Sequence, residues 1–575
     1  MEDIELTKKI IDIARGEAPA DILLKNAFLV NVFTGEILTA NVALKGSVIA
    51  GVGDYSWGQE VVNLAGKYII PGLIEAHLHI ESSLLTPANF AAAAVVHGTT
   101  TVIADPHEIV NVAGLDGLRY MVNAAQELPL DIFYMLPSCV PATQLETTGA
   151  IIGPAEIQEG FKICPSSPGL AEVMNFPGVY LKEPDVLAKI KTACENKCLI
   201  DGHAPALSGK NLNAYLSAGI LTDHECTTLE EALEKLRLGM KIIIREGSAA
   251  KNLLDLLPLV NEKTWPNLLF GCDDRHPADL ITEGEIDNIL RRAVAAGLDS
   301  VAAVQIATLN PARHYHLPGL GGIAPGYKAD LVVVNNLTEF KVEMVYKAGK
   351  LVAREGKILD GLSGNLSEAV DKQILNTVHL PDLRRRLTLN KPPSSILARV
   401  IEVLPDQILT KGVLIPAGKI SSPEGILKVA VVERHGKNGN VALGLVKGFG
   451  LIKGALASTV AHDSHNLILV GENEENMELA AQTVAATGGG LAVTAGGKVL
   501  ASLALPVAGL MSDLDASTVA RQYQKLNDAA REIGCTLPSP FMTMSFLALP
   551  VIPELRITDG GLVDVNKLEF TALWA

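Results

Sequence analysis

Aromatic side chains are scarce in this sequence: Phe, Trp and Tyr together make up 4% of its 575 residues. Charged residues are also few, at 19% against a usual ~25%, whereas apolar residues make up 48%. Because so much of the chain can be buried, disorder is excluded as its main state. With few aromatics, the cores must consist mainly of Ala, Val, Leu, Ile and Gly, which suits Ala-rich helices packed on β-branched strands.

Positive charge is in deficit, since 48 Lys and Arg face 64 Asp and Glu and the formal net charge is −16. Such a chain would repel a phosphate backbone or an anionic membrane surface, so we expect neither nucleic acid nor membrane as a partner. The seven cysteines are odd in number and widely spaced, which does not fit a disulfide framework. The longest apolar stretch, residues 499–511, is too short to span a bilayer. The N-terminus carries no secretory pattern, and we expect a soluble, cytoplasmic protein.

The order of the segments indicates how the chain is organised. Short strand patterns separated by turn signals occur at residues 21–53 and again at 328–357. Between residues 72 and 316, eight strand-like apolar runs alternate with helix-like stretches, as in a (β/α)8 barrel, which needs ~250 residues. The two flanking pieces can close into one small β-sandwich because the ends of an inserted domain often lie close together.

We therefore predict an α/β protein in which a (β/α)8 TIM barrel is inserted in a small β-sandwich and followed by a C-terminal α+β domain. A homo-oligomer, such as a dimer, is also expected, because some apolar helix faces would otherwise stay uncovered. The predicted boundaries are 1–70 for the N-terminal helix and the first part of the sandwich, 71–320 for the barrel, 321–362 for the second part of the sandwich, 363–393 for a linker and 394–575 for the C-terminal domain.

Residue types that bind metals stand at the ends of the strand-like runs. In a barrel of this kind, the C-terminal ends of the strands form the active-site face. His77 and His79 are two residues apart, so on a strand both imidazoles point the same way and can reach one ion. A lone histidine is more often structural, but this conjunction indicates a site for two divalent cations bridged by a carboxylate. The candidate ligands are His77, His79, Glu172, His203, His224 and Asp273.

Several longer motifs around these residues carry a family resemblance. They are HLHIESSLLTP at 77–87, HGTTTVIADPHEIVNV at 97–112, DGHAPALSGKNLNAYLSAGI at 201–220, IREGSAAKNL at 244–253 and CDDRHP at 272–277. The sequence resembles the amidohydrolase superfamily, and within it the adenine deaminases of bacteria and archaea. The similarity extends over nearly the whole chain, including its C-terminal part.

The resemblance implies hydrolytic deamination of adenine to hypoxanthine and ammonia, a reaction of purine salvage or catabolism. It also implies a pair of divalent metal ions, Mn²⁺ or Fe²⁺, with Glu172 as the bridging ligand where many relatives use a carboxylated lysine. Zn²⁺ suits the same imidazole and carboxylate ligands, so the ligand types do not identify the metal.

The chemistry of this reaction assigns further roles. A divalent cation lowers the pKa of bound water from 15.7 toward ~7, and the resulting hydroxide attacks C6 of the purine. Asp273 is the candidate general base that takes the water proton and later gives it to the leaving ammonia. The N1 atom of adenine must gain a proton, for which Glu108 and His107 are the candidate catalytic and substrate-binding residues.

Alternatives remain open at this point. A cyclic-amide hydrolase on the same scaffold, such as a dihydroorotase or hydantoinase, is a second reading, because a fold does not fix the substrate. A metal-free barrel that acts only as an assembly partner is a third. Activity on adenosine or 6-substituted purines depends on the shape of the pocket. The segment with His462 and His465 either forms a local turn network or reaches the active site from outside the barrel.

Overall fold

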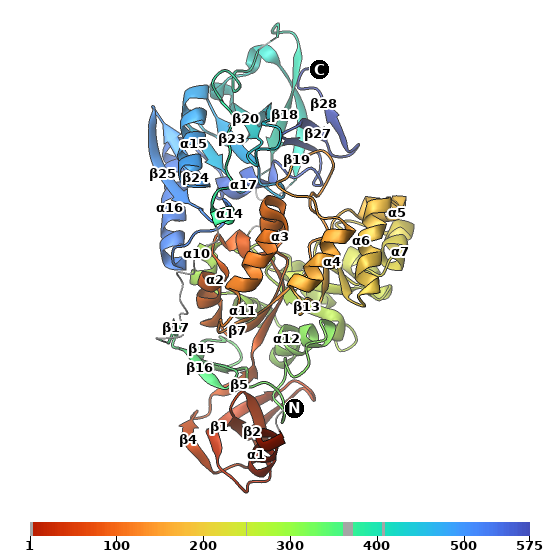
Figure 1. The fold of residues 1–575 in the computed structure, drawn as a ribbon, viewed down its shortest axis with the longest axis vertical. Helices are drawn as coiled ribbons and strands as arrows, with labels where there is room; N and C mark the ends of the chain where they lie inside the picture. The colour runs from red at the N-terminus through yellow and green to blue at the C-terminus, as the bar shows by residue number, and fades with distance from the viewer. Residues whose placement is uncertain (1–3, 249, 360–371, 391, 405–408) are drawn as a thin grey trace.

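The structure is a computed structural model that describes residues 4–248, 250–359, 372–390, 392–404 and 409–575. It has the form of an elongated stack, with N-terminal strands at one end, a middle body of strands and helices, and a β-rich C-terminal domain at the other end (Figure 1). None of the helices in the described part of the chain combines the length and the apolar character needed to cross a membrane.

The first sheet has nine strands, which come from both sides of the middle body. Strand β5 pairs antiparallel with β14, so Ile69 lies opposite Val333 although the two are far apart in sequence. Helix α1 (Ile4–Ala14) packs its buried Ile13 against the start of this sheet. The strands are β1 (Ala20–Asn31), β2 (Glu36–Lys45), β3 (Val48–Gly53), β4 (Gly58–Asn63), β5 (Tyr68–Pro71), β14 (Leu331–Val334), β15 (Val342–Lys347), β16 (Lys350–Arg354) and β17 (Lys357–Ile358).

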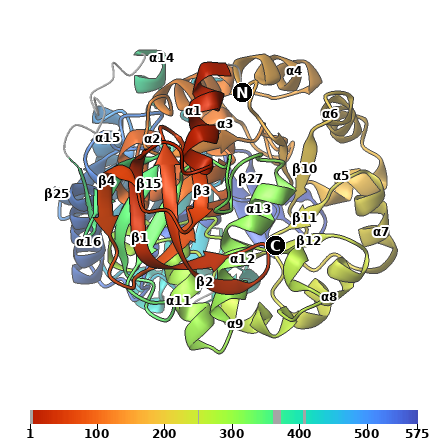
Figure 2. The ribbon, with the colours of Figure 1, turned by 90° about the horizontal axis from the view of Figure 1, so that it is seen from below.

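The described part of the middle body contains eight strands, each paired in parallel with a neighbour. They lie at the apolar runs from which the sequence predicts strands. They are β6 (Leu73–Leu78), β7 (Thr99–Ala104), β8 (Asp131–Tyr134), β9 (Gly169–Val173), β10 (Leu199–Gly202), β11 (Thr222–Asp223), β12 (Lys241–Arg245) and β13 (Leu268–Gly271). The helices between and after them are α2 (Pro87–Val95), α3 (His107–Ala124), α4 (Pro154–Ile163), α5 (Phe176–Leu181), α6 (Pro184–Glu195), α7 (Gly209–Ser217), α8 (Leu229–Arg237), α9 (Leu253–Leu256), α10 (Pro277–Thr282), α11 (Ile286–Ala295), α12 (Ser300–Ala307) and α13 (Leu309–His314). Seen from below, α4, α6, α7, α8 and α9 follow one another around the rim (Figure 2).

These eight strands do not form one continuous closed sheet in the described residues. They are divided into parallel sheets of three, two and three strands. Two isolated parallel bridges connect these small sheets. Leu78 to Asp273 joins the sheet of β6, β7 and β8 to the sheet of β11, β12 and β13, and Leu136 to Leu170 joins it to the pair of β9 and β10. The remaining gap lies between β10 and β11, because β11 has only two residues; there the Leu221 N–H donates to Ile200 O at 3.0 Å.

The C-terminal domain is rich in β-structure, and after α14 (Lys372–Leu375) it is built on an eight-stranded sheet. The sheet contains β18 (Leu397–Val403), β19 (Thr410–Pro416), β20 (Ile426–Val432), β21 (Val441–Lys447), β22 (Ala455–Ser458), β23 (Leu467–Gly471), β24 (Gly490–Ala495) and β25 (Lys498–Ala504). The remaining elements are α15 (Glu474–Ala486), α16 (Ala516–Glu532), α17 (Pro540–Phe546) and the three-stranded sheet of β26 (Leu555–Thr558), β27 (Gly561–Asp564) and β28 (Glu569–Thr571).

The C-terminal domain is fastened to the middle body by buried contacts. One apolar cluster is continuous across the junction, since it contains Val102 of β7 as well as Leu510. The loop after β8 is also held by hydrogen bonds: the Thr147 N–H donates to Asp559 Oδ1 at 2.8 Å, and Asn466 Nδ2 donates to Thr147 O at 2.8 Å. These contacts fix the C-terminal turns over the ends of the parallel strands.

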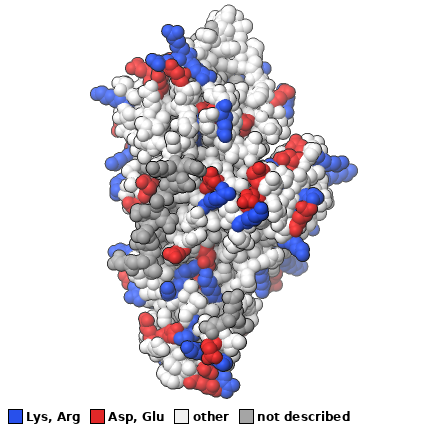
Figure 3. Space-filling view, in the orientation of Figure 1, with Lys and Arg blue, Asp and Glu red and all other residues white. Residues whose placement is uncertain are grey.

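Acidic and basic side chains are interspersed over the face of the molecule drawn in Figure 3. Among the residues coloured there, Lys and Arg do not gather into a continuous track along which a phosphate backbone would run.

Candidate metal centre

The six candidate ligands lie together at one end of the parallel strands. Pairing between the first and last strands of the middle body brings three of them side by side, because the Asp273 N–H donates to His77 O at 2.9 Å and the His79 N–H donates to Asp273 O at 3.2 Å. All are buried except His203, which is half-buried. The six are His77 on β6, His79 just after it, Glu172 on β9, His203 after β10, His224 after β11 and Asp273 after β13.

The two carboxylate oxygens of Glu172 face different histidines. Its Oε1 lies 3.5 Å from His79 Nε2, whereas its Oε2 lies 2.9 Å from His203 Nδ1 and 3.1 Å from His224 Nε2. A carboxylate that directs one oxygen to each of two imidazole groups has the arrangement needed to bridge two cations.

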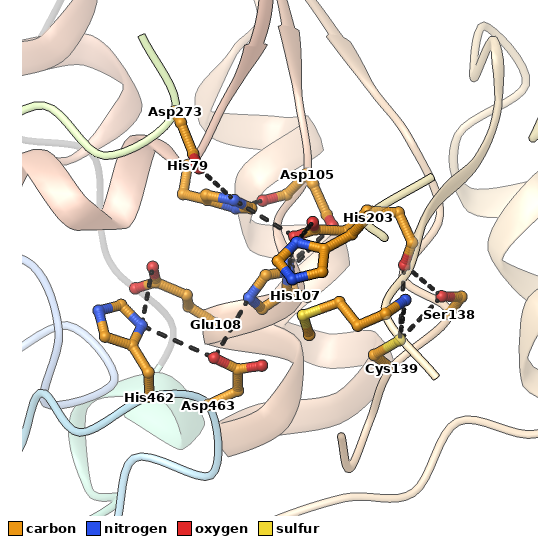
Figure 4. Close-up of polar contacts among 12 residues, drawn as sticks. His79, Asp105, His107, Glu108, Ser138, Cys139, His203, Asp273, His462 and Asp463 are labelled. Carbon is orange, nitrogen blue, oxygen red and sulfur yellow. Dashed lines mark hydrogen bonds and ion pairs between the residues drawn. The ribbon is translucent and has the colours of Figure 1, made fainter. Parts of the chain in front are cut away.

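Asp273 adds a second carboxylate on the side of the first histidine pair. Its Oδ1 lies 3.1 Å from His79 Nε2 and 3.6 Å from His77 Nε2 (Figure 4). His77, His79 and Asp273 therefore form one group of candidate ligand atoms, and His203 and His224 lie together beside Glu172 Oε2. The two sets adjoin, because His77, Glu172 and His224 are also close enough to share a cation.

The hydrogen bonding of the histidines fits metal binding. The Nδ1–H of His79 donates to Asp105 O at 3.0 Å, which leaves Nε2 as a lone-pair donor directed at the carboxylates. Metal-binding histidines usually have their second nitrogen fixed by such a partner. His77 Nε2 is buried without a hydrogen-bond partner among the described residues, as expected for an atom that awaits a cation.

The surroundings keep both carboxylates ionised, which a metal ligand requires. Burial alone would raise the pKa of Glu172, but hydrogen bonds from His203 and His224 hold that pKa well below its ordinary value. Burial would likewise raise the pKa of Asp273, whereas the positive charge of the adjacent Arg245 holds that pKa well below its ordinary value.

The sequence interpretation missed two buried residues, Arg245 and Glu225. The Arg245 guanidinium donates from Nη1 to both Asp273 Oδ2 and Glu225 Oε1, and from Nη2 to Glu225 Oε2 at 3.0 Å. Two features of the sequence could have indicated these residues. Glu225 directly follows the candidate ligand His224, and Arg245 ends β12 within the IREGSAA motif. The two terminal nitrogens of Arg245 pair with the two oxygens of Glu225, which fixes the guanidinium, and its Nη1 in turn holds Asp273 Oδ2.

His107 and Glu108, the candidates for protonating N1, lie at the start of α3 and are both buried. His107 Nδ1 lies 2.9 Å from Asp105 Oδ2 and 3.5 Å from Glu172 Oε1, so His107 borders the metal-ligand cluster. Ser82 Oγ donates to Glu108 Oε1 at 2.7 Å. Burial raises the pKa of Glu108 above its ordinary value, which favours the neutral acid form.

The C-terminal turn that carries His462 and His465 lies at this same end of the strands, where Figure 4 shows His462 and Asp463 beside Glu108 and His107. His462 Nδ1 lies 3.7 Å from Glu108 Oε1, and Asp463 Oδ1 lies 3.8 Å from His107 Nε2. Burial raises the pKa of Asp463, and the neighbouring His107 and His462 side chains oppose that rise. Residues from two distant parts of the chain therefore border one site.

Glu108, His462 and His465 are close enough to suggest a further cation site, but the hydrogen bonding argues against one. His465 Nδ1 accepts the Ala461 N–H at 3.2 Å. Burial lowers the pKa of His465 well below its ordinary value, so the ring is neutral and its single hydrogen must sit on Nε2. That nitrogen, 3.8 Å from Glu108 Oε2, therefore presents a hydrogen to the carboxylate instead of a lone pair.

A cavity of about 1150 Å³ opens onto these groups between the middle body and the C-terminal domain. From the middle body it is lined by His79, Glu172 and Asp273, and from the C-terminal domain by Asp463 and Phe546, among others. The cavity is ample for a small ligand and combines apolar walls with convergent charged groups, as small-molecule sites do.

Comparison with known proteins agrees with this arrangement. Residues 68–352 match the family described as "Amidohydrolase family", and residues 409–569 match the "Adenine deaminase C-terminal domain". The chain is 48% identical over 573 residues to the adenine deaminase of Kosmotoga olearia, covering 98% of both chains. It is 49% identical over 572 residues to the adenine deaminase of Desulfatibacillum aliphaticivorans, covering 98% of this chain and 99% of that one.

The α/β middle body and its cluster of histidines and carboxylates define an amidohydrolase with a separate β-rich C-terminal domain. The identity over nearly the full length narrows this class further, and the chain belongs to the adenine deaminase family. The resemblance drawn from the sequence motifs is thereby confirmed.

Proposed function

We propose that this chain hydrolyses adenine to hypoxanthine and ammonia at the cluster around Glu172. The observation that carries the proposal is the position of the two Glu172 oxygens, each directed at different histidines. Nearly full-length identity to adenine deaminases supports adenine as the substrate. The supporting fold is one (β/α)8 barrel, a reading favoured by the Leu78–Asp273 and Leu136–Leu170 bridges between its sheets.

The donor atoms suit two divalent cations, Mn²⁺ or Fe²⁺ first and Zn²⁺ also compatible. His77, His79 and Asp273 would hold one, His203 and His224 would hold the other, and Glu172 would bridge them. When bound, such ions lower the pKa of a water toward ~7 and so supply hydroxide at neutral pH.

Asp273 is the proton acceptor for the attacking water and the donor to the departing ammonia. Arg245 holds Asp273 Oδ2, while Oδ1 stays on the side of His77 and His79, where the reaction takes place. Its surroundings keep Asp273 ionised, so the carboxylate carries no proton before the water attacks.

Glu108 supplies the proton that N1 of the purine must gain as the tetrahedral centre forms. Its burial favours the neutral acid form, and the hydroxyl of Ser82 fixes its Oε1. His107 stands between Glu108 and Glu172 in the cavity wall and contributes to holding the substrate. Walls from the C-terminal domain exclude bulk water from this region, which strengthens the electrostatic interactions inside it.

The direct test is to incubate the purified, manganese-loaded protein with adenine and to follow the ultraviolet spectrum toward that of hypoxanthine. We expect complete conversion, with ammonia released in equal amount. Dihydroorotate and hydantoin serve as the matched cyclic-amide substrates in the same buffer. Turnover of a cyclic amide with no spectral change for adenine would overturn the proposal.

A further inference from the structure

Asp463 is a buried carboxylate that lacks a full set of partners. It is 3% exposed, and its Oδ2 has no hydrogen-bond partner among the described residues. Its Oδ1 lies 3.8 Å from His107 Nε2 and 3.7 Å from His462 Nδ1, both beyond hydrogen-bond distance. Buried polar atoms in folded proteins nearly always have a partner, so an orphaned carboxylate oxygen calls for a donor from a ligand or a water molecule.

The position of Asp463 points to a ligand. The residue lies on the turn between β22 and β23 of the C-terminal domain, yet it lines the same cavity as His79, Glu172 and Asp273. Figure 4 shows it beside His107, on the side away from Asp273. A molecule bound in this cavity can therefore contact both the carboxylates of the metal-ligand cluster and Asp463.

The turn that carries Asp463 is firmly held, so the carboxylate is preorganised. His435 Nε2 donates to Ser464 O at 2.8 Å, and the buried Arg434 donates from its Nε to His465 O. On the other side, Asn466 Nδ2 donates to Thr147 O of the middle body. Polar groups fixed in advance of binding contribute most to recognition because little order is lost when the ligand arrives.

The hydrogen-bonding groups of adenine determine which of its edges suits this carboxylate. The purine offers N–H donors at its exocyclic amino group and at one nitrogen of its imidazole ring, whereas its other ring nitrogens are acceptors. The amino group is at the reacting carbon, which must lie at the metal-ligand cluster. The imidazole N–H is therefore the donor that remains for an acceptor on the far side of the cavity.

On the basis of the proposed function, we propose that Asp463 accepts a hydrogen bond from the imidazole N–H of adenine and so selects the free base over purines substituted on that ring. A substituent at N7 or N9 removes the hydrogen and leaves a buried carboxylate without a partner. A site that pairs with a substrate N–H rejects an analogue lacking it by ~10⁴-fold or more, because the group in the protein stays unpaired. The C-terminal domain thus supplies a specificity-determining residue to the active site.

The test measures kcat/KM for adenine and the inhibition constants of 9-methyladenine and 7-methyladenine, together with the metal content, for the wild type, Asp463→Asn and Asp463→Ala. We expect both variants to keep the wild-type metal content and to raise KM for adenine at least ~10-fold. We also expect the preference for adenine over either methylated base to narrow by at least ~10-fold.

Asp559→Asn is the matched control, since Asp559 is a buried carboxylate of the same domain whose oxygens already accept from the Thr147 N–H and from Asn440 Nδ2. It should leave the preference between adenine and 9-methyladenine at the wild-type value. An unchanged preference in both Asp463 variants with metal retained would overturn the inference, and so would loss of metal in Asp463→Asn. A wild type that does not deaminate adenine would instead overturn the proposed function, and this inference with it.

Discussion

The Arg245 guanidinium donates to Oδ2 of Asp273, and the other oxygen of that carboxylate stays 3.1 Å from His79 Nε2. The buried guanidinium of Arg245 thus decides which oxygen of Asp273 faces His77 and His79. Arg245 also pairs with Glu225 through both of its terminal nitrogens, so a single side chain fixes two carboxylates at the edge of the cavity.

Replacing Arg245 by Gln should disturb the orientation of Asp273 without removing a metal ligand. Without the guanidinium, Asp273 is free to rotate and Glu225 loses its partner, so we expect kcat for adenine to fall about 100-fold while roughly the wild-type metal content is kept. Steady-state kinetics and elemental analysis on the same preparation check this. A variant with wild-type kcat would contradict the orienting role of Arg245.

Asp273→Asn and His77→Ala should fail in different ways. The amide keeps an oxygen that can ligate but cannot take a proton, so we expect most of the metal to remain and kcat to fall by ~10³-fold. His77→Ala removes a nitrogen donor and should lose metal itself. His97→Ala is the matched control, because His97 pairs with Asp287 at 3.2 Å and does not line the cavity. Equal metal loss in Asp273→Asn and His77→Ala would count against proton transfer by Asp273.

Glu108→Gln tests the source of the N1 proton. We expect kcat to fall ~100-fold or more with little change in KM, because glutamine keeps the shape of the side chain but not its acidic proton. Glu81→Gln is the control, since Glu81 Oε1 accepts the Ile109 N–H at 3.1 Å and a glutamine oxygen can do the same. If kcat fell equally in Glu108→Gln and Glu81→Gln, the loss would reflect a structural role of these two carboxyl groups and not acid catalysis by Glu108.

The junction between the first sheet and the middle body allows a prediction about stability. Lys347 Nζ is buried and donates to Asp131 Oδ2, Asp330 Oδ2 and Thr100 O at 2.6–2.7 Å. Lys347→Met would remove the ammonium group that lies between these two buried carboxylates and leave Lys328 as the remaining lysine beside Asp131. We expect the change to destabilise the fold by about 3–5 kcal/mol, measured as a lower Tm at pH 7.

The pH dependence of that loss follows from Asp131. Burial raises the pKa of Asp131, but Lys347 and Lys328 outweigh burial and hold it below 3.8. Its stabilising contribution is therefore complete above the pKa of the unfolded chain and is lost only as pH falls through the lower folded-state pKa. The Tm difference between wild type and Lys347→Met should stay constant from pH 8 to pH 5 and narrow at more acidic pH. A difference that narrows already between pH 8 and pH 6 would contradict this account.

The local parts of this structure could be predicted from the sequence. Apolar runs ending in polar residues located all eight strands of the middle body, and the spacing of His77 and His79 located one ligand pair. Closure of the barrel was not detected, because Thr222 and Asp223 alone form β11. Strand β11 pairs with β12 on one side, whereas toward β10 the described residues make the single backbone hydrogen bond from the Leu221 N–H to Ile200 O and no ladder.

The parts that sequence reasoning missed depend on contacts between distant segments. Nothing near Arg245 in the sequence shows that its guanidinium reaches Asp273, because Arg245 ends β12 whereas Asp273 follows β13. Asp463 meets His107 only because the C-terminal domain folds back over the strand ends. No periodicity encodes such a meeting, so the role of the C-terminal turn stayed open until the structure was known.

The measurement that tests the central claim most directly is the adenine assay with the metal content determined on the same sample. We expect the manganese-loaded protein to convert adenine into hypoxanthine with about two metal ions per chain, and removal of the metal to abolish the conversion. Fully loaded protein that leaves adenine unchanged, or full activity with less than about one metal ion per chain, would contradict a binuclear centre around Glu172.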